Sequence, residues 1–180
     1  MSDFKRACPI VIAGVPVYNG QDHLAATLDA LLAQDYPALK ILISDNASTD
    51  HTERIARAYA DRYAAITYIR QPHNLGAAGN FDYLRRQADG TYFFWAGAHD
   101  MWDPRFTSVL VAVLEREPAL MAPYPAGRFL DEHGTPAERM GTPHSFTDRS
   151  AAVRYVRMVI HRSLYMLYGI FRLNALKHMT

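Results

Sequence analysis

The stretch that decides the fold is residues 92–104, YFFWAGAHDMWDP. Its first four residues form an apolar run of strand length, and Gly97 interrupts that run before His99 and Asp100. Asp103-Pro104 then carries the N-cap and first-turn signature of a new helix. The pattern predicts a buried strand that ends in a carboxylate, at the edge where open α/β sheets bind ligands. Two interpretations follow: Asp100 and His99 hold a divalent cation or meet a phosphate, or Asp100 only caps a turn.

The same order of strand, polar loop and helix occurs three times before this stretch. Apolar runs of strand length occupy residues 10–15, 40–44 and 66–69, and apolar residues at helical spacing follow each polar loop. Asp50 and Glu53 have the spacing of a capping box at the start of the second helix. Strands and helices that alternate in this way form parallel sheets through right-handed crossovers. The predicted fold class is α/β, a Rossmann-like three-layer α/β/α arrangement around a mostly parallel central sheet.

The second half of the chain gives weaker signals. Apolar spacing predicts a helix from Phe106 to Leu114, a short strand at 120–124, a helix at 152–160 and a buried strand at 164–171. Residues 131–134 are typical of a hairpin turn. The polar segment 135–149 is either a mobile loop on the acceptor side or a plain surface excursion.

Composition limits the class of protein. The chain has 180 residues, 49% hydrophobic and 21% charged, which suits one globular domain over residues 1–180. A formal net charge of +1 with interspersed signs argues against nucleic acid as a partner. Cys8 is the only cysteine, which excludes an intrachain disulfide. Neither a signal peptide nor a membrane span is predicted, so we expect a cytoplasmic protein, with peripheral attachment to the inner membrane face as an alternative.

Polar residues follow all four predicted parallel strands. Because the carboxyl ends of parallel strands meet at one edge of a sheet, these residues should lie on one rim. Such a coincidence is harder to explain by loop chemistry than any single residue would be, and it favours a binding site. The residues are Tyr18 and Asn19, Asp45 and Asn46, Asn74 and Gly76, and His99 and Asp100.

Three motifs in these loops, together with the acidic motif, resemble the family 2 glycosyltransferases, which have the GT-A nucleotide-sugar fold. They are residues 15–19 (VPVYN), 44–50 (SDNASTD) and 74–80 (NLGAAGN). The resemblance covers residues 9–104, which it implies are the nucleotide-sugar-binding half, whereas 105–180 would be part of the acceptor-side half. Residues 168–172 (YGIFR) look like the family's later strand.

The resemblance implies a nucleotide-sugar site at these loops. In it Asp45 would accept a hydrogen bond from a ring N–H of the base, which favours a pyrimidine and hence a UDP-sugar donor. Ordinary turn chemistry is the alternative role for Asp45 and Asn46. The implied binding residues are Pro16, Val17, Tyr18, Asn19, Asp45, Asn46, Asn74, Gly76, Asn80, His99 and Asp100.

The acidic motif departs from the family pattern. An Asp-x-Asp sequence or a run of aspartates is common there, whereas this chain has Ala98-His99-Asp100. Asp100 aligns with the final, metal-binding acid, so the resemblance implies Mg²⁺ or Mn²⁺ bound through Asp100. His99 would suit Mn²⁺ better than Mg²⁺.

The implied reaction transfers a sugar from a nucleoside diphosphate sugar to a hydroxyl of a saccharide or lipid-linked acceptor, with inversion, in glycan or polysaccharide synthesis. The family's catalytic base follows the region of residues 168–172, and no Asp or Glu stands between Asp148 and Thr180. The catalytic base is therefore unassigned. We expect a shortened enzyme, a base supplied differently, or a non-catalytic nucleotide-sugar binding module. A sugar-phosphate nucleotidyltransferase is a weaker alternative, since the first loop lacks a Gly- and Arg-rich phosphate motif.

Overall fold

The computed structural model describes residues 8–130, 135–140, 146–148, 150, 153 and 167–178. Its main sheet has the strand order β3-β2-β1-β4-β7. The first four of these strands in sequence pair in parallel, and the short β7 pairs antiparallel to β4. Their bounds are β1 (Val11–Val17), β2 (Leu39–Asp45), β3 (Ile66–Arg70), β4 (Tyr92–Trp95) and β7 (Phe171–Arg172). This sheet confirms the predicted α/β class.

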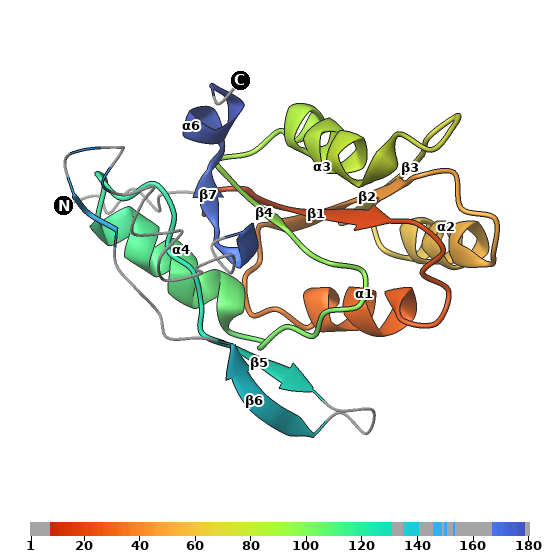
Figure 1. The fold of residues 1–180 in the computed structure, drawn as a ribbon, viewed down its shortest axis with the longest axis horizontal. Helices are drawn as coiled ribbons and strands as arrows, with labels where there is room; N and C mark the ends of the chain where they lie inside the picture. Colours follow the sequence, from red (N-terminus) through yellow and green to blue (C-terminus); the bar gives the residue numbers. More distant parts are fainter. Residues whose placement is uncertain are drawn as a thin grey trace, which may run out of the picture.

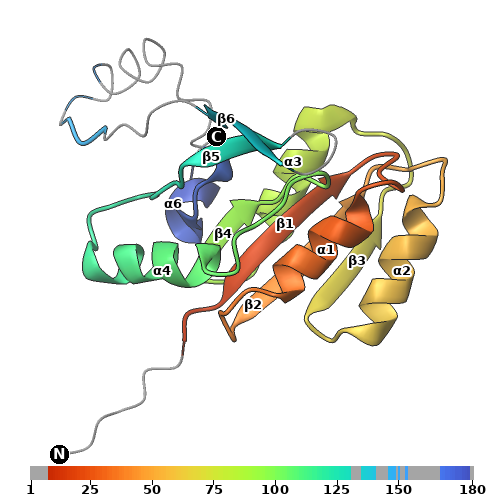
Figure 2. The same ribbon diagram turned by 90° about the horizontal axis from the view of Figure 1, so that it is seen from below.

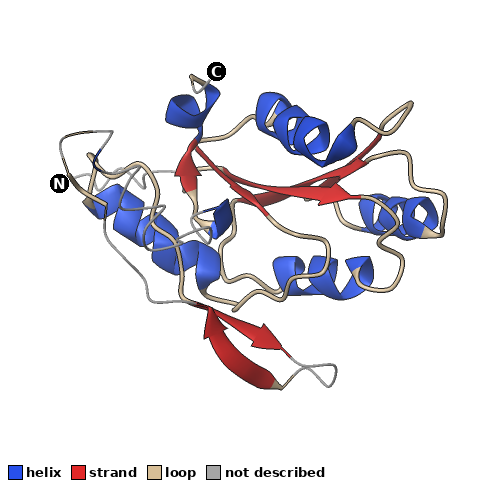
Figure 3. Cartoon of the chain, viewed as in Figure 1, coloured by secondary structure: helices blue, strands red, loops and turns tan. Residues whose placement is uncertain are grey.

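Helices cover both faces of the sheet. α3 and α6 lie on one face, and α1, α2 and α4 lie on the other, which gives three layers (Figures 1 and 3). Figure 2 shows α1 and α2 side by side along the sheet. The helix bounds are α1 (Leu24–Leu32), α2 (Thr52–Arg62), α3 (Gly76–Gln87), α4 (Phe106–Arg116) and α6 (Leu173–Lys177).

The alternation of side chains along β1 divides the core in two. Val11, Ala13 and Val15 pack in the cluster beneath α1, α2 and α4, whereas Ile12 packs in the cluster beneath α3 and α6. Successive strand residues point to opposite faces, so a strand covered on both sides must be apolar throughout. The absence of alternation in residues 10–15 is therefore explained by the two helical layers.

Pro16 lies in the central strand without removing a hydrogen bond from the sheet. Gly14 is the last residue of β1 in register with β4, and its carbonyl oxygen accepts a hydrogen bond from the Ala96 N–H at 2.8 Å. By alternation, an N–H at position 16 would face the same side, beyond the end of β4. β1 and β4 therefore separate there, at the point where the strand order reverses, which is where such sheets bind ligands.

Two helix starts differ from the predictions. α2 begins at Thr52 after His51, and Glu53 forms ion pairs with Arg57 and Arg70 instead of closing a capping box. The capping-box prediction was wrong because Asp50 uses its carboxylate in the turn before the helix, where it accepts from the Thr52 N–H at 2.9 Å.

In the same way, α4 begins at Phe106 after Arg105, not at Asp103-Pro104. Asp103 closes the preceding turn, because its side chain accepts a hydrogen bond from the Arg105 N–H at 2.8 Å.

The second half differs further from the sequence analysis. Residues 120–124 form no strand, although the carbonyl oxygens of Met121 and Pro123 accept hydrogen bonds from Arg172 and Ile170. Within 167–172, only Phe171–Arg172 is a strand. β5 (Gly127–Leu130) and β6 (Pro136–Met140) pair antiparallel and project from the main sheet (Figure 1). The predicted turn at 131–134 and most of the predicted helix at 152–160 lie outside the described residues.

Gly14 gives a direct test of this packing. A Cβ atom there would lie 2.8 Å from the ring of Phe93, which is fully buried. Gly14→Ala should therefore lower the free energy of unfolding by about 1–3 kcal/mol, measured as a lower urea midpoint. The double variant Gly14→Ala/Phe93→Leu should show a favourable coupling energy, because the smaller side chain removes the clash. Strict additivity of the two changes would contradict the proposed contact.

Candidate functional site

The first loop is fastened to the second by hydrogen bonds around Asn19. The Asn19 N–H donates to Ser48 Oγ at 2.9 Å, and its side-chain Oδ1 accepts from the Thr49 N–H at 2.8 Å. The next residue, Gly20, donates its N–H to Thr52 Oγ1 at 2.8 Å. Asn19 has φ 51°, a left-handed conformation that asparagine tolerates. Its amide oxygen is thus engaged in holding two loops together.

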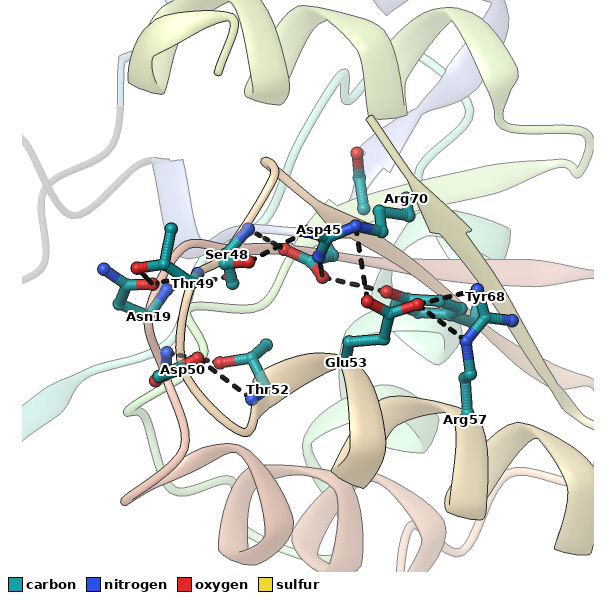
Figure 4. A network of polar contacts seen from close by, with 12 residues as sticks. Asn19, Asp45, Ser48, Thr49, Asp50, Thr52, Glu53, Arg57, Tyr68 and Arg70 are labelled. Carbon is teal, nitrogen blue, oxygen red and sulfur yellow. Dashed lines mark hydrogen bonds and ion pairs between the residues drawn. The ribbon is translucent and has the colours of Figure 1, made fainter. Parts of the chain in front are cut away.

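Asp45 is a fully buried carboxylate with three partners (Figure 4). Its Oδ1 accepts from the Ser48 N–H at 2.8 Å, which closes an Asx turn. Its Oδ2 accepts from the Tyr68 hydroxyl and from Arg70 Nη1, both at 2.8 Å. Burial, with the hydrogen bond to Asp45, raises the pKa of Tyr68, so its hydroxyl stays protonated as a donor. This satisfied network stabilises an otherwise costly buried charge.

Arg70 connects this carboxylate to the surface. Its Nη2 donates to the Ser48 carbonyl oxygen at 2.9 Å, and its Nε lies 3.4 Å from a carboxylate oxygen of Glu53. Arg57 pairs with Glu53 and stacks over the Tyr68 ring at 5.0 Å (Figure 4). One third of the Arg70 side chain is exposed. Arg70 is therefore a fixed cation that still faces solvent.

Asn46 joins the second loop to the third. Its amide Nδ2 donates to Asn74 Oδ1 at 2.8 Å and to the Gly76 carbonyl oxygen at 3.2 Å, and its Oδ1 accepts from the Leu75 N–H at 2.8 Å. Asn74 Oδ1 also accepts from the Gly76 N–H at 2.7 Å. Gly76 has φ 73°, a conformation that favours glycine. Asn46 thus shapes the turn that starts α3.

A second buried cluster lies behind this turn. Asn80 donates to the Ser44 carbonyl oxygen at 2.9 Å, while its own amide oxygen accepts from Ser44 Oγ at 2.5 Å. Gln71 Nε2 donates to the same Ser44 hydroxyl at 2.9 Å. All three side chains are buried, so they fix α3 and β3 against β2.

Asp100, in the loop after β4, differs from the polar residues of the other loops in its hydrogen bonding. No partner among the described residues bonds to its buried Oδ2 atom, and its Oδ1 lies 3.9 Å from Nε2 of the exposed His99. Burial raises the pKa of Asp100, while the nearby His99 opposes that shift. A Cβ atom at Gly97 would clash with Asp100 Oδ2, so the carboxylate packs against a position that admits no side chain. A buried acceptor without a partner among the described residues is uncommon in native proteins and requires an explanation.

The predicted residues therefore divide into two groups. Asn19, Asp45, Asn46 and Asn80 bond to other parts of the protein, and Val17 is a buried core residue at the end of β1. The second group presents atoms to solvent: Tyr18, which is 51% exposed, Gly76, His99 and the partly exposed Asp100. Asn19 and Asn74 belong to both groups, because they are exposed and their side chains also bond to a neighbouring loop. Pro16 is half-buried in β1.

The structure assigns no catalytic base to the segment after residues 168–172. The described part of that segment consists of α6 and His178, and its sequence contains no Asp or Glu. Thr180, before which the sequence analysis found no base, lies outside the described residues. The catalytic residue of the expected reaction therefore remains unassigned in this chain.

The sequence analysis missed the partners of the polar loop residues. Tyr68 and Arg70 are two residues apart on β3, so their side chains lie on the same face of the strand and both reach Asp45. This contact can be predicted only once β2 is known to be the neighbour of β3. Gln71 looked like an ordinary loop residue. Thr27 was hidden within the apolar face of α1, although its hydroxyl bonds to the Asp100 carbonyl oxygen at 3.0 Å.

The residues fit a divalent cation only as part of a shared site. Among residues 8–130 and the other described segments, no three His, Cys, Asp or Glu side chains gather to hold a metal. The available donors are the unpaired Asp100 carboxylate oxygen and the His99 imidazole. Mg²⁺ and Mn²⁺ sites of this kind use one or two protein ligands and take the rest from substrate phosphates and water.

The comparisons with known proteins identify the family. The profile of glycosyl transferase family 2 matches residues 13–165. That match covers most of the 180 residues, so the chain belongs to this family.

Curated relatives match over a limited part of their length. An uncharacterized glycosyltransferase of Rickettsia typhi is 31% identical over 108 residues, which are 60% of this chain and 33% of that protein. The putative glycosyltransferase EpsE of Bacillus subtilis is 32% identical over 109 residues, which are 60% of this chain and 39% of that protein. The matched part of this chain thus spans well under half of each relative.

Solved structures show the same fold. The mannosyltransferase PcManGT of Pyrobaculum calidifontis, in complex with GDP-Man and Mn²⁺, is 27% identical with a TM-score of 0.58, over 65% of this chain and 35% of that one. Residues 1–349 of S. aureus TarS superimpose with a TM-score of 0.69 at 19% identity, over 93% of this chain and 48% of that one. At that identity the likeness to TarS shows the fold alone. The comparisons therefore confirm the predicted GT-A fold.

Within the part of the chain that the structure describes, no helix has the length and apolar character needed to span a membrane.

Ala47 tests the backbone of the second loop. Its φ of 61° is left-handed, a conformation that costs an L-residue about 1–2 kcal/mol and costs glycine little. Ala47→Gly should therefore raise the free energy of unfolding by up to about 1 kcal/mol. The same change at the exposed Ala58 of α2 should lower it by about 1 kcal/mol, because glycine is a poor helix former. Equal signs in the two urea titrations would contradict this account.

Asp45 tests the buried network. The resemblance implied a role for Asp45 in recognising the base, and the buried network adds a structural role. Asp45→Ala leaves the Tyr68 hydroxyl, Arg70 and the Ser48 N–H without their acceptor, so it should cost about 1–3 kcal/mol of unfolding free energy. Asp61→Ala, at an exposed position on α2, should change stability by less than about 0.5 kcal/mol. Similar melting temperatures for both variants would refute a structural role of Asp45.

Proposed function

We propose that this chain is the nucleotide-sugar-binding part of a glycosyltransferase that moves a sugar from a nucleoside diphosphate sugar, with a UDP-sugar favoured, to an acceptor hydroxyl. One observation carries the proposal: the loops after β1, β2, β3 and β4 lie at one edge of a parallel sheet whose strand order reverses between β1 and β4, and Asp100, in the last of these loops, has a carboxylate oxygen with no partner among the described residues. A crevice at this point of an open sheet is the usual ligand site of such folds.

The exposed groups have the chemistry that a nucleoside diphosphate requires. The Tyr18 ring offers an apolar face on which a base can stack, and Arg70 offers a fixed positive charge. Gly76, which has no side chain, and the third-loop amide of Asn74 border the same rim. The structural neighbours support this class of ligand, since PcManGT was solved with GDP-Man and TarS with UDP and with UDP-GlcNAc.

Asp45 acts on this site in one of two ways. In its present arrangement its lone pairs serve Ser48, Tyr68 and Arg70, so it orients Arg70 at the rim. A base whose ring N–H bonds to Asp45 would have to displace one of these donors. We propose the orienting role, with direct contact to the base as the alternative.

The acidic loop would hold the diphosphate. A divalent cation, when bound, neutralises negative charge that grows on the leaving diphosphate during sugar transfer. Asp100 and His99 would hold that cation together with the phosphate oxygens. We further propose an inverting reaction in glycan or polysaccharide synthesis, with a saccharide or lipid-linked acceptor, in the cytoplasm or at the inner membrane face.

A second candidate function is favoured by the same loop. The Ala98-His99-Asp100 sequence supplies a single carboxylate, which also suits a module that binds a nucleotide sugar without transferring the sugar. The two functions differ in outcome: the module binds donor without releasing free nucleotide or extending an acceptor.

Nucleotide binding provides the test. A ligand at one hundred times its Kd stabilises the native state by about 2.7 kcal/mol, which in a chain of this size raises the melting temperature by about 5–10 °C. We expect such a shift with UDP or GDP in the presence of Mn²⁺. Tyr18→Ala should weaken nucleotide binding about tenfold, because stacking contributes about 1–3 kcal/mol per base. Tyr18→Phe, which keeps the ring, should bind as the wild type does.

The outcomes separate the alternatives. The absence of any shift with UDP, TDP or GDP would overturn the nucleotide assignment. Normal binding by Tyr18→Ala would remove the stacking role and leave the rest of the site intact.

A further inference from the structure

The backbone of the acidic loop is fastened at two points, one on α1 and one in the segment just after α1. At the first, the Thr27 hydroxyl donates to the Asp100 carbonyl oxygen at 3.0 Å, and the Thr27 side chain is 1% exposed. The two residues are 73 positions apart in the sequence, so this contact exists only because α1 packs beside the end of β4. The bond fixes the backbone of the very residue whose carboxylate oxygen is unpaired.

The second point is Gln34, which follows Thr27 by seven residues. Gln34 lies just beyond the end of α1 at Leu32, and its N–H donates to the Leu31 carbonyl oxygen at 3.3 Å. Gln34 Nε2 donates to the Asp103 carbonyl oxygen at 2.7 Å. Its Oε1 accepts from the N–H and the hydroxyl of Thr107 at 3.0 and 2.8 Å. The segment from Asp100 to the first turn of α4 is therefore held by α1 and by Gln34, just after α1.

The Asp100 carboxylate depends on this backbone more than most carboxylates do. Within the described part of the chain, no hydrogen bond orients its Oδ2 atom. Its position comes instead from the backbone: the Asp100 N–H donates to the Gly97 carbonyl oxygen at 3.1 Å, and the side chain packs over Gly97. A shift of the Asp100 carbonyl group would therefore carry the carboxylate with it, since no hydrogen bond from a described residue holds its Oδ2 atom in place.

We propose that Thr27 and Gln34 are positioning residues, which set the place of the Asp100 carboxylate, and thereby the binding of a cation-bound diphosphate, without touching the ligand. This inference rests on the proposed function of the site. It assigns a role to one side chain of α1 and to one just after α1, neither of which contributes a group to the rim. Residues that orient metal ligands from behind typically change metal affinity about 10–100-fold when they are altered.

Thr27→Val and Thr27→Ser form the first matched pair. Valine keeps the shape of threonine and loses the hydroxyl, whereas serine keeps the hydroxyl. Calorimetric titration with UDP and with GDP, each with and without Mn²⁺, gives the factor by which the cation tightens nucleotide binding. Thr27→Val should reduce this factor about tenfold or more and leave metal-free affinity unchanged, while Thr27→Ser should keep both values.

Gln34→Glu gives a second, independent variant at a half-buried site that tolerates the change better. The carboxylate can still accept from Thr107, but it loses the donor to Asp103 and turns a negative oxygen toward that carbonyl group. The factor by which Mn²⁺ tightens nucleotide binding, called the Mn²⁺ enhancement below, should again fall. Gln87→Glu, the same substitution at the exposed end of α3, should leave the enhancement unchanged.

The results distinguish this inference from the proposed function. If the wild type binds nucleotide and the Mn²⁺ enhancement is unchanged in both Thr27→Val and Gln34→Glu, the positioning role is refuted and the nucleotide site stands. A wild type that binds nucleotide equally with and without Mn²⁺ refutes it as well. Failure of the wild type to bind any nucleotide overturns the proposed function itself, and the inference with it. Equal losses with and without Mn²⁺ would indicate a general packing defect and refute the specific role.

Discussion

The parallel pairing of β1 on both of its edges is the constraint on which the rest of the structure depends. A strand between two parallel neighbours is covered by helices on both faces, so β1 must be apolar, and every crossover must return the chain to the same edge. Pro16 lies just beyond the last residue paired with β4, where its missing N–H costs nothing. The four loops therefore lie at one edge of the sheet, and the strand order reverses between β1 and β4.

The meeting of the loops has two consequences that are easily confused. Most of their polar side chains bond to one another: Asn19 to the second loop, Asn46 to the third, and Asp45 to Tyr68 and Arg70 of β3. These bonds build a rigid frame. A few groups take no part in these hydrogen bonds, and they are the ones available to a ligand. Because buried polar groups need hydrogen-bond partners, most polar side chains in these closely packed loops bond to one another.

The sequence predicted the strands and loops better than the interactions of the individual residues in them. The strands near residues 10–15, 40–44, 66–69 and 92–95 were expected and are present, because buried parallel strands have a strong local signature. The capping box at Asp50 and Glu53 was wrong, since Glu53 pairs with Arg70, a residue of the neighbouring strand β3. The strand predicted at 120–124 was wrong because a short apolar run says little without its neighbours.

The sequence by itself determined the α/β class, the family and the four loops that form the rim, because these follow from local periodicity and from motifs within single loops. Only the tertiary structure decided what each polar residue does. It showed that Asp45 and Asn46 are occupied by other parts of the protein, that Asp100 keeps an unpaired oxygen, and that Thr27 holds the Asp100 backbone from α1. The physical reason is that hydrogen bonds and burial depend on which segments lie side by side, and the bonds that join different elements of this site connect residues 22 to 73 positions apart along the chain.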